Sequence, residues 1–202
     1  MPNDTGAFGL KPIRMRDGTP WNGADEKCYV SSLYATAIYI GMAVQRETET
    51  DNVDATGEHM SVEVVDSLSS GVWYGVVVGI EPVQTNLNLN YIPASTGGYV
   101  YVAVGANVVF LARGDGGAST VSLDIGYNAP MVATAAGTAA TGVCGWHLAQ
   151  ASIAVTQTLP LTILRVHQKE DNVAGVNALY EVVLNTGWPT LAGGDYLAVA
   201  ST

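Results

Sequence analysis

The feature that most constrains the fold is a succession of short β-type segments separated by turn-forming residues. Val, Thr, Ile and Tyr dominate these segments, and turn residues recur roughly every ten positions, which is the spacing of β-sandwiches and β-barrels. Strands are expected at 28–33, 36–44, 61–65, 71–80, 99–103, 107–113, 120–125, 159–166 and 176–185. The sequence therefore predicts an all-β fold with little helix, built as a single compact β-barrel or β-sandwich.

Residues 1–23 precede the first strong β pattern and are predicted to form an extended N-terminal arm and a turn. The stretch 6–16 is apolar and basic, and Gly and Pro interrupt it too often for a regular element. Such an arm is stabilised by lying on a surface, either its own domain's or a partner's. We expect a strap that crosses a partner, is mobile in the free protein, and can be deleted without unfolding a single β-domain at 24–202. Its expected contact residues are Phe8, Leu10, Lys11, Pro12, Ile13, Arg14 and Arg16.

The charge balance restricts the partners. The formal net charge is -10, and charged residues make up 13% of the chain against 48% hydrophobic residues. An acidic body disfavours direct binding to nucleic acid or to an anionic membrane. No stretch reaches the ~18 uncharged apolar residues of a spanning helix, and Lys and Arg occupy the place of a signal-peptide core. Synthesis in a cytoplasm is therefore expected.

No group of residues points to catalysis, a metal or a cofactor. The histidines lack the spacing of metal ligands; they are His59, His147 and His167. An acidic loop lacks the ligand order of an EF-hand and is expected to be solvated; it contains Asp51, Asp54 and Glu58. We predict a protein that is not an enzyme and has no cofactor. Two buried reduced thiols are expected, with a disulfide as the alternative, at Cys28 and Cys144.

Small residues and aromatic side chains suggest self-association. The segment 129–142 consists almost wholly of small residues and is interpreted as a loose loop or a close-packed interface segment. Cyclic symmetry is the common closed arrangement, so we expect a homotrimer, with a dimer as the alternative. Candidate interface anchors are Trp73, Tyr99 and Tyr101, which core packing would explain equally well.

Taken in chain order, several segments resemble the head decoration, or capsid cement, proteins of tailed bacteriophages. Residues 8–14 are similar to the N-terminal arm of that family, and 34–44 resemble one of its strands, although the usual Asp-Pro pair is missing after Gly41. Residues 71–76 and 99–110 resemble two further strands; 107–110 keep Asn-Val-Val-Phe without the acidic residues that precede it in the family. Residues 171–185 are similar to the closing strand. The likeness covers most of the chain.

The resemblance implies a β-tulip-like domain on the outside of an icosahedral capsid. The implied partners are the major capsid protein and further copies of the chain, and the implied location is the virion. Many weak, identical contacts on one shell would act together through avidity. Two alternatives remain open from the sequence: another virion β-domain, associated with a tail tube or a fibre, or a carbohydrate-binding module that uses exposed tyrosines.

Overall fold

The computed structural model describes residues 3–48, 54, 56–83, 86–117 and 125–185. The predicted all-β fold is confirmed, since this part of the chain contains twelve strands and a single short 3₁₀ turn, η2 (Gln150–Ser152). The strands in chain order are β1 (Leu10–Met15), β2 (Glu26–Val30), β3 (Ala43–Arg46), β4 (Val62–Val64), β5 (Gly75–Ile80), β6 (Gly98–Val104), β7 (Val108–Arg113), β8 (Asn128–Ala129), β9 (Met131–Thr138), β10 (Val143–Leu148), β11 (Leu161–Val166) and β12 (Leu179–Leu184).

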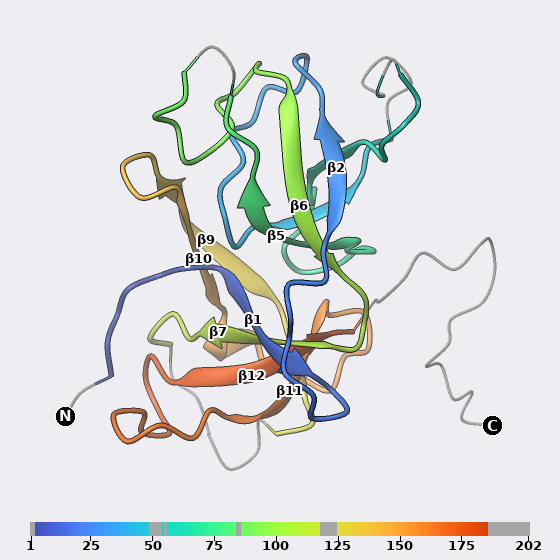
Figure 1. Ribbon diagram of the computed structural model, residues 1–202. Helices are drawn as coiled ribbons and strands as arrows, with labels where there is room; N and C mark the ends of the chain where they lie inside the picture. Colours follow the sequence, from blue (N-terminus) through green and yellow to red (C-terminus); the bar gives the residue numbers. More distant parts are fainter. Residues whose placement is uncertain (1–2, 49–53, 55, 84–85, 118–124, 186–202) are drawn as a thin grey trace.

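The strands form two five-stranded antiparallel sheets and one hairpin. The upper sheet of Figure 1 has the order β2-β6-β5-β3-β4, and the lower sheet has the order β1-β7-β12-β11-β8. The hairpin of β9 and β10 lies beside both sheets. In Figure 1 the labelled upper strands run up the view, whereas β7 and β12 run across it, so the sheets cross. The described strands form open sheets, so of the two predicted architectures the sandwich fits and the closed barrel does not.

One hydrophobic core joins the two sheets. Val76 and Val102 contribute from the upper sheet, and Phe110 and Val182 contribute from the lower sheet. Leu148 contributes from β10, and the side chains of all five residues are fully buried. Because the cluster is continuous, the two sheets stabilise each other through apolar burial rather than folding as separate units.

The N-terminal arm is part of the domain, and the expectation that it forms no regular element is wrong. Strand β1 pairs along its length with β7, and a bulge lies between Pro12 and Arg14. Leu10 is 2% exposed and belongs to the core. Residues before the strand also fold back, since the side chain of Asn3 donates to the carbonyls of Val173 and Val176 at 2.7 and 2.8 Å. Deleting residues 1–16 would therefore remove a strand from the lower sheet.

The segment expected to be a loop or interface at 129–142 contains strand β9, paired with β10 in a hairpin. The ring of Tyr39 lies where a side chain at Gly137 would project, so packing explains this glycine, whereas the small residues 133–136 are exposed. Strand β5 begins at Gly75, so the strand expected from residue 71 is shorter than predicted. Most of the strand expected at 120–125, and the Gly-rich tail at 186–202, lie outside the described residues.

Two glycines bring the arm against the upper sheet. The N–H of Leu10 donates to the carbonyl of Gly41 at 2.9 Å, and the N–H of Gly41 donates to the carbonyl of Val77 at 2.8 Å. Both Gly9 and Gly41 have positive φ, at 68° and 94°. A Cβ on Gly41 would collide with the carbonyl oxygen of Phe8, and one on Gly9 would collide with that of Gly41. Glycine is required here for close backbone approach as well as for its conformation.

We predict that Gly41→Ala destabilises the protein more than Gly18→Ala does. Gly18 has nearly the same φ, 93°, but no atom lies within 4 Å of the point that a Cβ would occupy there. The difference between the two variants therefore isolates the collision from the backbone strain. We expect Gly41→Ala to lose about 2 kcal/mol more than its control, measured as the free energy of unfolding in urea. Equal losses in the two variants would show that the contact is easily relaxed.

Candidate functional site

An apolar groove lies where β1 passes between the two sheets. Its volume is about 550 Å³, within the range of about 300–1,000 Å³ that is usual for ligand pockets. The lining comes from the arm, the turn after it, and strands of both sheets and the hairpin. The lining residues are Phe8, Leu10, Lys11, Pro12, Trp21, Ile40, Val77, Val78, Leu111, Val143 and Leu179. All of these side chains except Lys11 are apolar, so Lys11 carries the only charge of the lining.

The groove brings together only part of the predicted arm site. Phe8, Lys11 and Pro12 line it with partly or fully exposed side chains, whereas Leu10 is buried at its base. Ile13, Arg14 and Arg16 do not line it. Ile13 is half-buried, the Arg16 side chain is exposed, and Arg14 is held in an ion pair within the chain.

The sequence reasoning missed seven lining residues: Trp21, Ile40, Val77, Val78, Leu111, Val143 and Leu179. Trp21 carried a usable signal, because it is the one aromatic residue in the polar turn at 17–23. Its indole Nε1 is buried and has no hydrogen-bond partner among the described residues. The other six are ordinary residues of strands or, for Ile40, of an isolated β-bridge, and only the folded arrangement brings them to one place.

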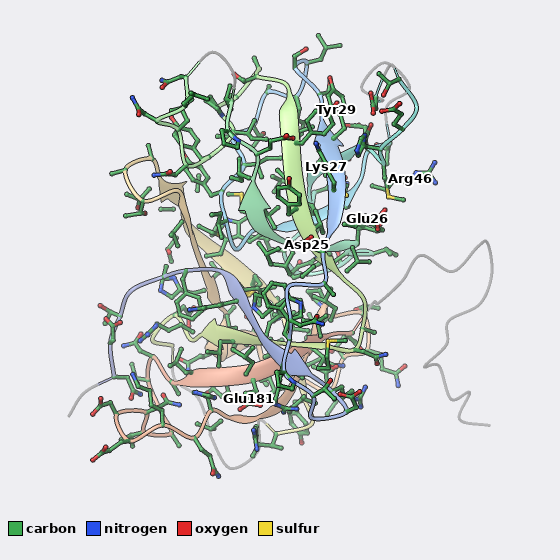
Figure 2. All side chains as sticks on the ribbon, viewed as in Figure 1. Asp25, Glu26, Lys27, Tyr29, Arg46 and Glu181 are labelled. Carbon is green, nitrogen blue, oxygen red and sulfur yellow. The ribbon has the colours of Figure 1, made fainter. Side chains whose placement is uncertain are left out.

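A buried carboxylate holds β1 to the lower sheet. Glu181 on β12 is 1% exposed, and Figure 2 shows it in the lower half of the molecule. One carboxylate oxygen accepts from Arg14 Nη2 at 2.7 Å and Nε at 3.2 Å. The other lies 2.9 Å from Arg165 Nη2 and 3.0 Å from His167 Nδ1. Arg14, expected among the arm residues that contact a partner, is therefore paired within its own chain.

These partners decide the charge state of Glu181. Burial alone would raise the pKa of this carboxyl, but hydrogen bonds from Arg165, His167 and Arg14 outweigh burial and hold the pKa at about 2. Glu181 is therefore ionised at neutral pH. The arrangement is a structural ion-pair network, since its carboxylate oxygens already contact partners within the chain.

The predicted aromatic anchors separate into a buried one and two that face outward. Trp73 is fully buried, and its Nε1 donates to the carbonyl of Ser67 at 3.2 Å, so its expected role at a subunit interface is wrong. Tyr99 and Tyr101 alternate with buried Val100 on β6 and lie on the outer face of the upper sheet. Tyr101 lies over Gly79 of the neighbouring strand β5.

Tyr99 lies at the centre of a small surface cluster. The ring centroids of Tyr29 and His59 are 5.6 and 5.1 Å from its own, and the Nζ of Lys27 is 4.2 Å away over the ring. Lys27 also forms an ion pair with Glu81 at 2.7 Å. Figure 2 shows Lys27 and Tyr29 together on β2. Because a cation and a tilted ring cover Tyr99, its face is not a flat stacking platform.

The remaining reactive groups do not assemble into a centre in the described part of the chain. Cys28 and Cys144 are both buried and unpaired, so the expectation of two free thiols is confirmed and the disulfide alternative is wrong. Among the described residues no set of three or more His, Cys, Asp or Glu side chains is grouped for a metal ion. No described helix has the length and apolar character that a membrane span requires.

We predict that Glu181→Gln destabilises the protein at neutral pH by about 3 kcal/mol, because it leaves Arg14 and Arg165 without their buried counter-charge. A carboxyl whose pKa is lower in the folded state contributes stability above its unfolded pKa near 4.3 and loses it as pH falls toward the folded value. The difference between parent and variant should therefore shrink between about pH 4.5 and pH 2.

Urea unfolding at several pH values measures this difference. Glu170→Gln is the matched control, because Glu170 is exposed in the loop between β11 and β12. The control should match the parent protein within about 0.5 kcal/mol at each pH. A parent–variant difference that does not change with pH would contradict the assignment of the network.

We predict that neither thiol reacts in the folded protein at pH 8. Burial raises the pKa of Cys28 and of Cys144 to about 12, so the reactive thiolate is scarce. Titration with Ellman's reagent should detect no thiol in the native protein and both after unfolding in urea. Rapid reaction of the native protein, or none after unfolding, would contradict the structure.

A scan against models of protein families found no match for this chain, and searches among curated proteins and among solved structures found none either. No relative therefore supplies a function, and the groove, the Glu181 network and the Tyr99 cluster stand on their geometry. Of the three, the groove is the candidate site. It is concave and partly exposed, and its side chains have few polar partners within the chain.

Proposed function

We propose that the protein is a virion structural protein that binds the outside of an icosahedral phage capsid and stabilises the shell. The observation that carries this proposal is the pairing of the segments that resemble capsid decoration proteins. Pro12 of the first segment is opposite Phe110 of the fourth, and Phe110 is opposite Val182 of the last. In the upper sheet, Ala43 is opposite Val76, which joins the second segment to the third. Each of the five segments thus contributes residues to paired strands of one fold.

Two residues in these segments have structural roles that fit a fold shared with the capsid decoration proteins. Gly41 permits the contact between the arm and the upper sheet. Asn172 closes the loop between β11 and β12, because its side chain donates to the carbonyls of His167 and Leu179 and accepts from the N–H of Leu179. The likeness therefore falls on residues that determine the fold, which supports an origin in the same structural family.

The surface is suited to assembly. Lys11 and Arg16 of the arm are exposed and have no ion pair among the described residues, so they are available to acidic groups of the major capsid protein. Several large apolar side chains are more than half exposed on loops and strand ends: Leu33, Val72, Leu87, Ile125, Val155, Val173 and Val176. We propose that neighbours on the shell cover part of this surface and that the protein assembles there as a homotrimer or dimer.

Carbohydrate binding is the second candidate, and the outward-facing tyrosines favour it. Tyr29, Tyr99 and Tyr101 lie on one face of β2 and β6. Sugar rings stack on exposed aromatic faces, but Lys27 already occupies the face of Tyr99. This contact places carbohydrate binding second. A tail-tube or fibre-associated domain is the remaining alternative and shares the all-β architecture.

Immunogold electron microscopy tests the location. Antibodies raised against the full chain are applied to phage particles released from the host that encodes it, with pre-immune serum as the control. We expect label distributed over the head exterior. Purified protein should also rebind to heads from which it has been stripped, and it should raise the temperature at which those heads release their DNA.

The alternatives predict different outcomes. Label confined to the tail would replace the capsid assignment with the tail or fibre assignment. Unlabelled particles, together with saturable binding on a glycan array that Tyr101→Ala abolishes, would favour the carbohydrate-binding module. Either result would overturn the proposal.

A further inference from the structure

The apolar groove is built to accept an apolar molecule. Leu111 of β7, Val143 of β10 and Leu179 of β12 remain partly exposed in it, although each belongs to a strand. An empty concavity with such a lining leaves apolar surface in contact with water, and covering it contributes roughly 25 cal/mol per Å². Its volume of about 550 Å³ matches a small organic ligand rather than a single side chain.

The edge of β1 is not suited to the addition of an extended peptide strand. The N–H of Leu10 already donates to the carbonyl of Gly41. Two residues further along the strand, Pro12 has no N–H to donate. Successive outward donors are thus used or missing, whereas strand addition requires a row of free ones. An occupant of the groove must bind through apolar contact and through the few polar groups at its border.

The groove carries a positive charge, whereas the protein as a whole is acidic. Lys11 borders the groove, is exposed, and has no ion pair among the described residues. None of the described residues that line the groove is a carboxylate, although the chain carries a net charge of -10. Trp21 also lines the groove, and its indole N–H has no hydrogen-bond partner among the described residues. Both groups favour an occupant that carries oxygen acceptors and a negative charge.

We propose that this groove is a binding site for an amphiphilic carboxylate, that is, an alkyl chain ending in a carboxyl group. The chain lies against Val78, Leu111 and Val143, and the carboxylate lies beside Lys11. This proposal does not depend on the capsid assignment, since it uses only the groove and its border.

Isothermal titration calorimetry of the full chain tests the site with two probes of equal chain length. The probes are dodecanoate and the cation dodecyltrimethylammonium, each kept below its micelle concentration at pH 8. We expect one saturable site that prefers dodecanoate by about tenfold, which corresponds to about 1.4 kcal/mol. Non-specific attraction to an acidic protein would give the opposite preference, because the cation would bind better.

Two pairs of variants locate the site. Leu111→Trp fills the groove and should weaken dodecanoate binding at least about tenfold, whereas Leu33→Trp adds the same ring at an exposed position and should leave binding unchanged. Lys11→Gln should reduce the preference for the anion by about two- to fivefold, whereas Lys169→Gln removes the same charge from the loop between β11 and β12 and should not. Urea unfolding confirms that each variant is folded.

Several results would overturn the proposal. One is the absence of saturable dodecanoate binding, and another is equal binding by Leu111→Trp and Leu33→Trp. A preference for the cation would exclude the role of Lys11. If Leu111→Trp instead changes the sedimentation coefficient of the protein and leaves dodecanoate binding intact, the groove is an interface between copies of this chain and not a ligand site.

Discussion

The arrangement of the lower sheet depends on keeping one carboxylate charged out of water. An isolated buried charge costs several kcal/mol, so the loss of the partners of Glu181 would destabilise the fold. The partners of Glu181 come from two strands. Arg165 lies on β11 and His167 directly follows β11, whereas Arg14 lies on β1. The first two are near in sequence and follow from the hairpin. Arg14 is the distant partner, and its ion pair fixes the position of β1 along the sheet.

The groove is a consequence of that position. With β1 held to β7 and to Glu181, the chain before the strand must turn toward the upper sheet, and Gly9 meets Gly41 at backbone distance. The arm meets the upper sheet at this contact, and the groove opens beside it, with Trp21 and Val78 in its lining. The same arm that was expected to reach for a partner thus forms one wall of a concavity on its own domain.

The local sequence pattern predicted much of the fold, but it did not predict strand β1 or strand β9. The β-type composition predicted most of the strands, because alternation and turn spacing are properties of a few adjacent residues. The arm was misjudged because its Gly and Pro content is a local signal, whereas its structure comes from β7 and from Glu181, which is 167 residues beyond Arg14 in the chain. The small residues of β9 were interpreted as a loose loop or a close-packed interface segment, since the Tyr39 ring that requires Gly137 cannot be inferred from their composition.

The groove was also beyond sequence reasoning, for the same reason. Leu111, Val143 and Leu179 are indistinguishable from core residues in the sequence, and only the crossing of the sheets leaves them partly exposed. Trp73, by contrast, was proposed for a surface and is in the core. In both cases exposure is decided by packing between sheets, which local periodicity does not encode.

The ion pair between Arg14 of β1 and Glu181 of β12 constrains the order in which the lower sheet can form during synthesis. Arg14 is made 167 residues before Glu181, so the two partners of this ion pair are translated at widely separated times. Strand β7 lies between β1 and β12 in the sheet, so β1 and β7 can pair early, but the charge of Arg14 finds its buried partner only at the end. The lower sheet is therefore completed only after β12 has been made. Such long-range pairing slows folding, so the nascent chain presents β7 as an unpaired edge until β12 leaves the ribosome.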